Sequence, residues 1–278
     1  MTSNNSDNNN IDYMNSRPLD VHTWSDYSEV NDFVDDIYQL LKSIKGHKKG
    51  NKRLLKVLLL DLYVAWCADH ELKIMSSRDN NAYKAKSRYN ELHISKKIRD
   101  IVDVMVAEGI VYEKQGFNDR VRGVAFQSRL WATDGLIEQF KAARFSQFHI
   151  HSHEAREPVV LRDKAKKDIE DYKDTPFVIS TRSLLADYNQ LLANTHIDIY
   201  DLEKPVLEIG EGKKKMRLQI NQQDKFVRRI FNNSRWDQGG RFYGGWWQRC
   251  PKEYRKKIKM DGVMTAEIDF SGLHIVML

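Results

Sequence analysis

The sequence has little cysteine and no long apolar run. Its 278 residues include two cysteines, Cys67 and Cys250, which lie far apart. This argues against a disulfide framework and fits a reducing compartment. No apolar run approaches the roughly 20 residues that a membrane-spanning helix needs. The first ten residues lack a basic segment followed by an apolar stretch, so we predict no secretory signal and expect a cytoplasmic protein.

What the sequence does contain is a basic surplus. Lysine and arginine number 45 against 39 acidic residues, for a net charge of +6, and 41% of the residues are hydrophobic. The apolar content allows globular cores, and the length suits about two domains. A basic surplus concerns partners rather than fold. We therefore expect a nucleic acid as partner and no membrane role; the resemblance described below makes duplex DNA the expected nucleic acid.

The first half divides into a tail, a helix and a basic segment. Residues 1–24 are rich in Asn, Ser and Asp, which predicts a mobile tail. Apolar residues then recur at three- and four-residue steps from Val30 to Ile44, which predicts an amphipathic helix. Residues 45–53 are basic and contain two glycines. They are either a solvated connector or a DNA contact.

The sequence next predicts two further helices and a hairpin. Residues 54–67 form an apolar helix, and a second helix begins near Ser95, a good N-cap, and stops at Gly109. Residues 110–112 and 124–126 predict two short strands around a polar tip, residues 115–123. Thr133 is expected to cap another helix.

This order of elements resembles the winged helix-turn-helix of transcription regulators and plasmid replication initiators. The resemblance covers residues 52–145. It implies a DNA-binding domain over residues 25–147 in a protein of the α+β class. In that family the helix before the hairpin enters the major groove and the hairpin tip contacts the backbone or minor groove. The resemblance therefore assigns DNA contacts to Lys96, Lys97 and Arg99 on the helix and to Arg120 and Arg122 at the tip. The alternative is a module that only packs against a neighbouring domain.

The middle of the chain offers one candidate cluster. His149, His151 and His153 alternate, so a strand would present all three on one face. Three imidazoles could bind zinc; the alternative is a solvent-exposed or phosphate-facing cluster. Thr181 predicts the start of a structural helix that carries apolar residues up to Leu192.

Basic and aromatic residues alternate with glycines after Phe226. Arginines could contact phosphates and aromatic rings could stack on bases. The alternative is a tightly packed corner of glycine and tryptophan. The candidates in this segment are Arg241, Arg249 and Arg255 for phosphates, and Tyr243, Trp246 and Trp247 for bases.

The same segment resembles the DNA polymerase I-like (family A) polymerases, and more loosely the single-subunit phage RNA polymerases. The resemblance covers residues 226–278 and implies a partial polymerase-like domain over residues 148–278. It rests on Gly240-Arg241, on Gln248 with Pro251, on Arg255, and on the run Asp269-Phe270-Ser271-Gly272-Leu273.

The resemblance implies a role for each matching residue. Arg241, Gln248 and Arg255 would contact nucleic acid on the primer–template side. Asp269 would be the catalytic carboxylate that binds Mg²⁺, with the carbonyl of Phe270 as a second ligand. A nucleotide would approach Ser271, Gly272 and His274. His274 stands where the DNA polymerases usually have Glu, which leaves sugar selectivity open.

Several functions remain open. The family's second metal-binding aspartate and its nucleotide-binding helix are expected beyond Leu278, so we expect a truncated, inactive fragment of a replication-type nucleotidyltransferase from a mobile element or phage. The first alternative is a non-enzymatic winged-helix regulator or replication initiator with a C-terminal clamping or oligomerisation domain. The second is a metal-dependent nuclease that uses Glu267 and Asp269. Asp269 could also be only a helix N-cap.

Overall fold

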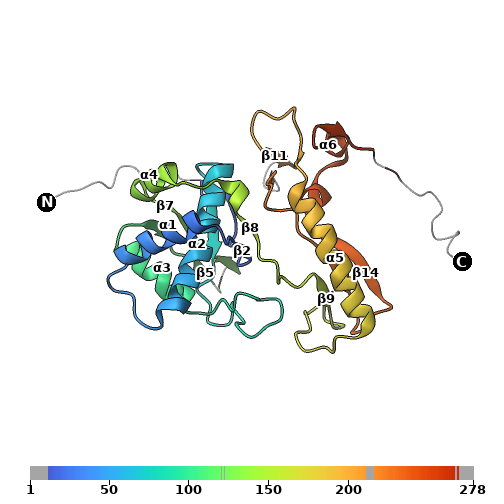
Figure 1. Ribbon diagram of the computed structural model, residues 1–278, viewed down its shortest axis with the longest axis horizontal. Helices are drawn as coiled ribbons and strands as arrows, with labels where there is room; N and C mark the ends of the chain where they lie inside the picture. Colours follow the sequence, from blue (N-terminus) through green and yellow to red (C-terminus); the bar gives the residue numbers. More distant parts are fainter. Residues whose placement is uncertain (1–11, 120, 122, 211–215, 267, 269–278) are drawn as a thin grey trace, which may run out of the picture. The chain divides into compact units, whose positions relative to one another are not determined.

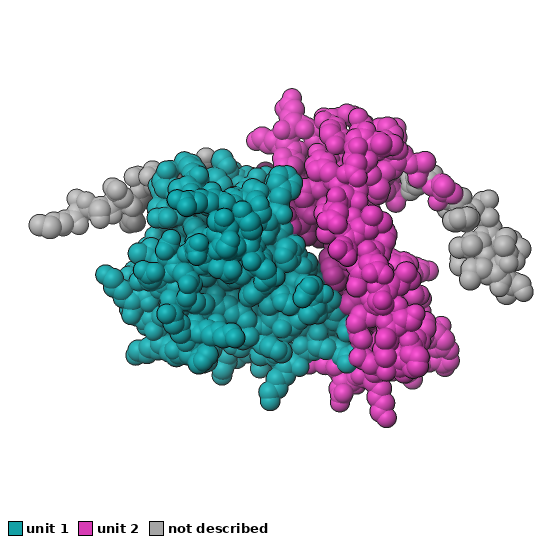
Figure 2. Space-filling model, in the orientation of Figure 1, with its two compact units in different colours: residues 1–157 teal, residues 158–278 magenta. Residues whose placement is uncertain are grey.

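The computed structural model describes residues 12–119, 121, 123–210, 216–266 and 268 (Figure 1). The chain divides into two compact units, residues 1–157 and 158–278, which are coloured separately in Figure 2. This division falls a short way past the domain boundary predicted after residue 147. Both units combine helices with strands. The protein therefore belongs to the α+β class, as predicted.

Unit 1 is built around four helices and a four-stranded sheet of order β1-β3-β7-β4. Its elements are β1 (Ser16–Pro18), β2 (Thr23–Trp24), α1 (Ser28–Leu40), α2 (Lys48–Ala68), β3 (Lys73–Ser76), α3 (Ile98–Ala107), β4 (Val111–Lys114), β5 (Phe117–Asp119), β6 (Val124–Phe126), β7 (Ser128–Ala132), α4 (Asp134–Ala142), the 3₁₀ helix η2 (Gln147–His149) and β8 (His151–Ser152).

Helix α2 begins earlier than the sequence predicts. Residues 48–53, interpreted as part of a linker, form its first turns, and the side chain of His47 accepts a hydrogen bond from the Gly50 backbone N–H at 3.4 Å. Lysine and arginine are good helix formers, so a run of them continues a helix as readily as it forms a connector. The basic segment is therefore rigid over most of its length.

The middle of α2 is buried on every side. Each residue from Leu54 to Ala65 is buried, including Lys56 and Asp61. α1, α3, β2 and β3 pack around this helix. A helix enclosed in this way must pair its polar side chains internally, because an unpaired buried charge is strongly destabilising.

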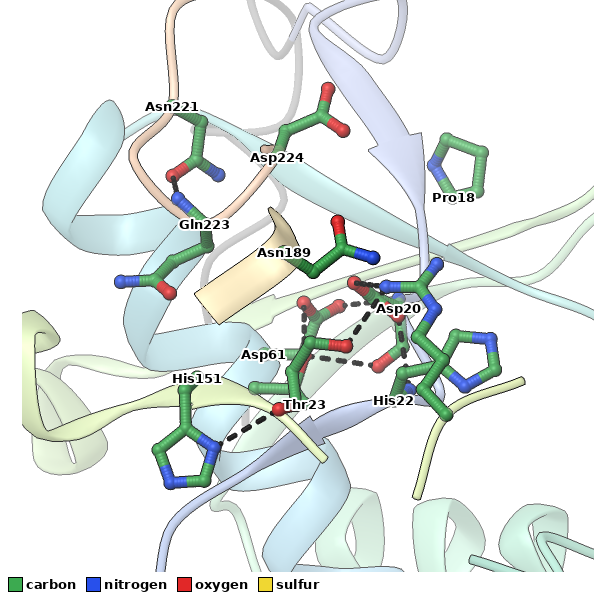
Figure 3. A network of polar contacts seen from close by, with 12 residues as sticks. Pro18, Asp20, His22, Thr23, Asp61, His151, Asn189, Asn221, Gln223 and Asp224 are labelled. Carbon is green, nitrogen blue, oxygen red and sulfur yellow. Dashed lines mark hydrogen bonds and ion pairs between the residues drawn. The ribbon is translucent and has the colours of Figure 1, made fainter. Parts of the chain in front are cut away.

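Asp61 is paired by the segment that the sequence assigns to a mobile tail (Figure 3). The Arg17 guanidinium donates to both carboxylate oxygens of Asp61, at 2.7 and 3.0 Å, and the Asp20 backbone N–H donates at 3.1 Å. Burial raises the pKa of the Asp61 carboxyl, and the Arg17 guanidinium opposes that shift. β1 also pairs in parallel with β3. The predicted tail over residues 1–24 is therefore wrong for residues 12–24; residues 1–11 lie outside the described part.

The hairpin after α3 pairs differently from the prediction. Val111–Lys114 pairs with Ser128–Ala132, while Val124–Phe126 pairs with Phe117–Asp119. Lys114 lies opposite Arg129 and Phe117 opposite Phe126, so two residues separate the two ladders on each strand. The register is thus continuous. At the interruption, a Cβ on Gly116 would lie 2.2 Å from the Phe126 carbonyl oxygen, so only glycine fits.

The predicted helices of unit 1 are present, with shifted ends. α1 matches the apolar period from Val30, although it ends at Leu40. α3 begins at Ile98, with Lys97 as N-cap, so Ser95 is two residues too early. Thr133 caps α4 as predicted, because its hydroxyl accepts from the Leu136 N–H at 3.4 Å.

Unit 2 consists of one long helix with small sheets. The sheets have the orders β14-β13-β9, β10-β15-β16 and β11-β12. Its elements are β9 (Val159–Leu161), α5 (Pro176–Asn194), β10 (Ile197–Asp198), β11 (Val206–Ile209), β12 (Met216–Gln219), β13 (Val227–Phe231), β14 (Gly239–Gly244), the 3₁₀ helix η4 (Trp246–Arg249), α6 (Lys252–Arg255), β15 (Lys259–Met260) and β16 (Val263–Met264).

The N-cap of helix α5 lies six residues before the predicted cap, Thr181. Thr175 caps it, with Pro176 in the first turn, and its hydroxyl accepts from the Val178 N–H at 3.3 Å. Thr181 is a buried residue within the helix. The threonine followed by proline was the better signal, because proline is favoured in a first turn.

Candidate nucleic-acid interfaces

The N-terminal ends of α2 and α3 form one basic surface in unit 1. A Cβ added to Gly46, just before α2, would lie 3.9 Å from the Lys97 ammonium group, just before α3. We define the basic end as five exposed lysines, none of which forms an ion pair with any described residue. They are Lys45, Lys48, Lys49, Lys96 and Lys97.

The two predicted lysines of the DNA-contacting helix belong to this surface, but Arg99 does not. The Arg99 guanidinium donates to the carbonyl of Arg78 at 2.8 Å and to the Asn80 side chain at 2.7 Å. Its backbone N–H closes the turn onto the Lys96 carbonyl at 3.1 Å. Arg99 therefore shapes the start of α3 instead of facing a ligand.

The exposed side of α3 is acidic. Asp100, Asp103 and Glu108 are all exposed along it. Arg78 pairs with Asp103 at 2.5 Å and also with Glu113 of β4, which ties the helix to the hairpin. Phosphates would be repelled by this side of α3. The N-terminal end, with Lys96 and Lys97, is the part of α3 suited to an anionic partner.

The two predicted contacts at the hairpin tip, Arg120 and Arg122, lie outside the described residues. The strands β5 and β6 carry an exposed cross-strand pair, Phe117 and Phe126, with ring centroids 5.2 Å apart. Because the register is continuous from β4 and β7 into β5 and β6, these two strands extend the hairpin beyond the four-stranded sheet.

A second basic and aromatic surface lies on the β13–β14 hairpin of unit 2. Arg241 lies opposite Ile230 and Tyr243 opposite Arg228, which places Arg228, Arg241 and Tyr243 on one face. Arg241 and Tyr243 are exposed. On the other face, the Arg229 guanidinium lies 5.5 Å from the Phe242 ring centroid, and Phe242 contacts Tyr188 of α5.

Gln248 holds the end of this hairpin. Its side-chain oxygen accepts from the Gly244 N–H at 3.1 Å, and its amide nitrogen donates to the Phe242 carbonyl at 3.3 Å. Gly244 has φ +124°, and a Cβ there would lie 2.1 Å from the Phe226 carbonyl oxygen. Gln248 of the Gln-x-x-Pro element is thus bonded to the Gly244 end of β14, the strand that also carries Gly240 and Arg241 of the Gly-Arg element.

The remaining candidates after Phe226 are less accessible. Trp246 is completely buried and Trp247 is half-buried. Arg249 pairs with Asp224, and Arg255 is half-buried in α6. Of the three predicted aromatic platforms, only Tyr243 offers an exposed ring. The predicted packed corner of glycine and tryptophan describes Trp246 correctly.

The candidates of the polymerase-like metal motif lie outside the described residues. They are Glu267, Asp269, Phe270, Ser271, Gly272 and His274. The last described strand before them, β16, ends at Met264. Thr265 donates through its hydroxyl and its N–H to the Ile258 carbonyl.

The three histidine side chains do not form one cluster. His149 stacks on Tyr27 with ring centroids 4.2 Å apart, His151 is exposed, and His153 packs edge-on against Trp24. The His149 Nδ1 atom accepts the Ser146 backbone N–H, and that of His153 accepts the Ala155 N–H. Among the described residues, no group of three His, Cys, Asp or Glu side chains could hold a metal ion.

Comparisons with protein-family models, with curated proteins and with solved structures found no match to this chain. Within the described ranges, no helix is both long enough and apolar enough to cross a membrane.

Proposed function

We propose that unit 1 is a winged-helix module that binds duplex DNA within a replication-type protein. Its support is the order of elements: β3, then α3, then a hairpin, with the strands arranged β3-β7-β4. The observation that carries the proposal is the continuous register of the hairpin. It extends the hairpin past β4 and β7 through β5 and β6, and a wing at that end would meet the DNA backbone through Arg120 and Arg122.

The charge distribution suggests how the module would dock. The lysines of the basic end would neutralise phosphates, whereas the acidic side of α3 disfavours deep insertion of that helix along the groove. The expected mode is therefore contact through the N-terminal ends of α2 and α3 together with the wing. Such binding would depend mainly on phosphates and less on base sequence.

The test is a titration of the full chain with duplex DNA at several salt concentrations. Changing Arg120 and Arg122 to Ala should weaken binding by about tenfold or more, because charge-assisted contacts are lost. The slope of log affinity against log salt should fall by about 0.9 for each phosphate contact removed. The control changes Lys164 and Lys167 to Ala, which removes the same charge from an exposed loop of unit 2.

An affinity unchanged by the wing substitutions would reject the wing assignment. A loss equal to that of the control would show that only overall charge matters. A non-enzymatic regulator or initiator would behave in the same way in this assay, since the proposal concerns the DNA-binding module that both hypotheses share.

We propose, as a second candidate, that unit 2 is the leading part of a template-directed nucleotidyltransferase. The observation that favours it is the hydrogen bonding of Gln248 to β14, the strand that carries Arg241 and Tyr243. Basic and aromatic side chains on one face suit a nucleic-acid strand. The metal ligand Asp269, proposed from the resemblance, would bind Mg²⁺.

A primer–template assay separates binding from transfer. We expect this chain to bind a primer–template, with affinity reduced by Arg241→Ala, because the exposed arginine would lose its phosphate contact. Incorporation that disappears in Asp269→Asn would show that the chain is catalytically sufficient. Unchanged primer–template affinity in Arg241→Ala would reject the role of this face.

A further inference from the structure

A groove lies beside the first turns of α2 in unit 1. It encloses about 590 Å³, within the range of about 300–1,000 Å³ that is usual for ligand sites. Trp24, His47, Lys49, Lys52, Arg53 and Lys56 line much of it. None of the residues that we assigned to DNA contacts lines this groove, apart from Lys49 of the basic end.

The groove carries surplus positive charge. Its four cationic side chains face two acidic ones, Asp35 and Glu91. Asp35 pairs with Lys52 inside the groove at 2.5 Å, and Glu91 pairs with His22, which does not line the groove, at 2.9 Å. Lys49 and Arg53 form no ion pair with any residue that the structure describes. An anion would complete the local charge balance.

Arg53 has unused donor capacity. Its side chain is half-buried, and its Nε atom is inaccessible to solvent yet has no hydrogen-bond partner among the described residues. A buried donor without a partner is unfavourable. The planar guanidinium presents its donors as a fork that matches a phosphate or a carboxylate.

Lys56 lies at the floor of the groove. Its ammonium group donates to the Ser25 carbonyl and to the Asn31 side chain, and it lies 4.0 Å from the Trp24 ring centroid. An ammonium group has three N–H donors, and the third has no hydrogen-bond partner among the described residues. Burial lowers the pKa of Lys56, and the negative charge of Asp26 opposes that shift.

The aromatic residues that line the groove favour a phosphate over a nucleobase as its ligand. One face of Trp24 is covered by Lys56, its ring is met edge-on by His153 at 5.6 Å, and its indole N–H donates to Asp26 at 2.9 Å. A base therefore has little exposed ring on which to stack. The groups left to bind a ligand are cationic hydrogen-bond donors.

We propose that this groove binds a phosphate group through Lys49, Arg53 and the remaining N–H of Lys56. The phosphate could come from the backbone of a DNA duplex or from a free phosphate compound. The groove adjoins the start of α3, since Gly46 lies beside Lys97. The DNA source rests on the function proposed above, whereas the free-phosphate source does not.

The first experiment measures duplex DNA binding by the full chain. Changing Lys49 and Arg53 to Ala should weaken binding by about tenfold or more and lower the salt slope by about 0.9 for each phosphate lost. Lys164→Ala with Lys167→Ala again serves as the matched control. Because Arg53 is half-buried, Lys49→Glu provides a second variant at an exposed position, where folding should not be affected.

The second experiment uses inorganic phosphate and follows the Gly50 backbone N–H by NMR. This N–H lies at the groove and donates only a long hydrogen bond, 3.4 Å, to His47. Phosphate should shift its resonance saturably in the parent chain and in the control. The shift should be lost in the Lys49 and Arg53 double variant and in Lys49→Glu.

Each pattern of results has one meaning. If phosphate shifts Gly50 while the groove variants bind DNA as the control does, a free phosphate compound is the ligand. If the groove variants lose DNA affinity and the wing variant does not, the groove stands and the wing assignment fails. If neither DNA affinity nor the phosphate-induced shift depends on Lys49 and Arg53, the groove proposal is overturned.

Discussion

The two units of the molecule achieve their stability differently. Unit 1 has one continuous core of thirty buried apolar side chains among its described residues, arranged around α2. Unit 2 has two smaller cores, of ten and five described residues. Burial of apolar surface is the main source of stability, so a single large core favours one cooperative unit.

The two units also differ in how deeply their ion pairs are buried. In unit 1 the carboxylate of Asp61 is 1% exposed and is enclosed with Arg17. Asp20 belongs to the same network: burial alone would raise its pKa, but the charges of Arg156, His22 and Arg17 hold it below the ordinary value. In unit 2 the pair Arg249–Asp224 is largely exposed.

Apolar surface differs too. Along α5, Phe177, Leu184, Tyr188 and Leu191 are exposed, and they recur at steps that place them on one stripe beside the buried face. In α2 every position from Leu54 to Ala65 is buried. Unit 1 therefore encloses its long helix, α2, only by pairing the internal charges of Arg17 and Asp61. Unit 2 leaves one side of its long helix, α5, uncovered among the described residues.

The largest expected effect comes from breaking the buried pair. Asp61→Asn should lower the free energy of unfolding by about 3–5 kcal/mol, because it leaves the Arg17 guanidinium without a countercharge in a buried site. Asp224→Asn, the matched change in unit 2, should cost only about 0–1 kcal/mol, because solvent screens an exposed pair. Chemical denaturation of both variants gives the two values.

Similar losses in the two variants would contradict the comparison. A small loss in Asp61→Asn would mean that the Arg17–Asp61 pair is hydrated and that residues 12–24 are held mainly by the pairing of β1 with β3. A large loss in Asp224→Asn would mean that the surface of unit 2 around Arg249 is enclosed.

A smaller but more direct effect is expected in native-state hydrogen exchange. Backbone N–H groups of Leu54–Ala65 in α2 should exchange at least about tenfold more slowly than the slowest of α5, which corresponds to about 1.4 kcal/mol of opening free energy. The reason is that α2 is enclosed by a large core and α5 is covered on one side only. Equal rates for the slowest N–H groups of both helices would show that the chain opens as one cooperative unit.

Local patterns predicted several elements well. The apolar period from Val30 predicted α1, the stripe from Ile98 to Met105 predicted α3, and Thr133 marked the start of α4. These signals are local, because an amphipathic period and a capping hydroxyl act within a few residues. The predictions failed where a distant partner decides the outcome.

Two failures show this dependence. Residues 12–24 are polar enough to suggest a tail, yet they are ordered by Asp61 and β3, more than forty positions away in the chain. The strand after the tip was expected to pair with residues 110–112, but the hairpin register places β7 there and β6 nearer the tip. Neither a buried carboxylate nor a cross-strand register can be recognised within one short segment.

The candidate sites also divide into features that the sequence predicted and features that only the tertiary structure decided. Composition indicated the basic surplus, since charge is a property of the residue, and the two family resemblances pointed to Lys96, Lys97 and Arg241. Only the tertiary structure placed Lys97 beside Gly46, engaged Arg99 internally and buried Trp246. The groove at Lys49, Arg53 and Lys56 had no signal in the sequence beyond a basic run. The sequence by itself determined how much positive charge and which local helices this protein has. The packing of distant segments against α2 decided which of those charges are left to bind a ligand, because burial and pairing depend on neighbours that the chain brings together only when it folds.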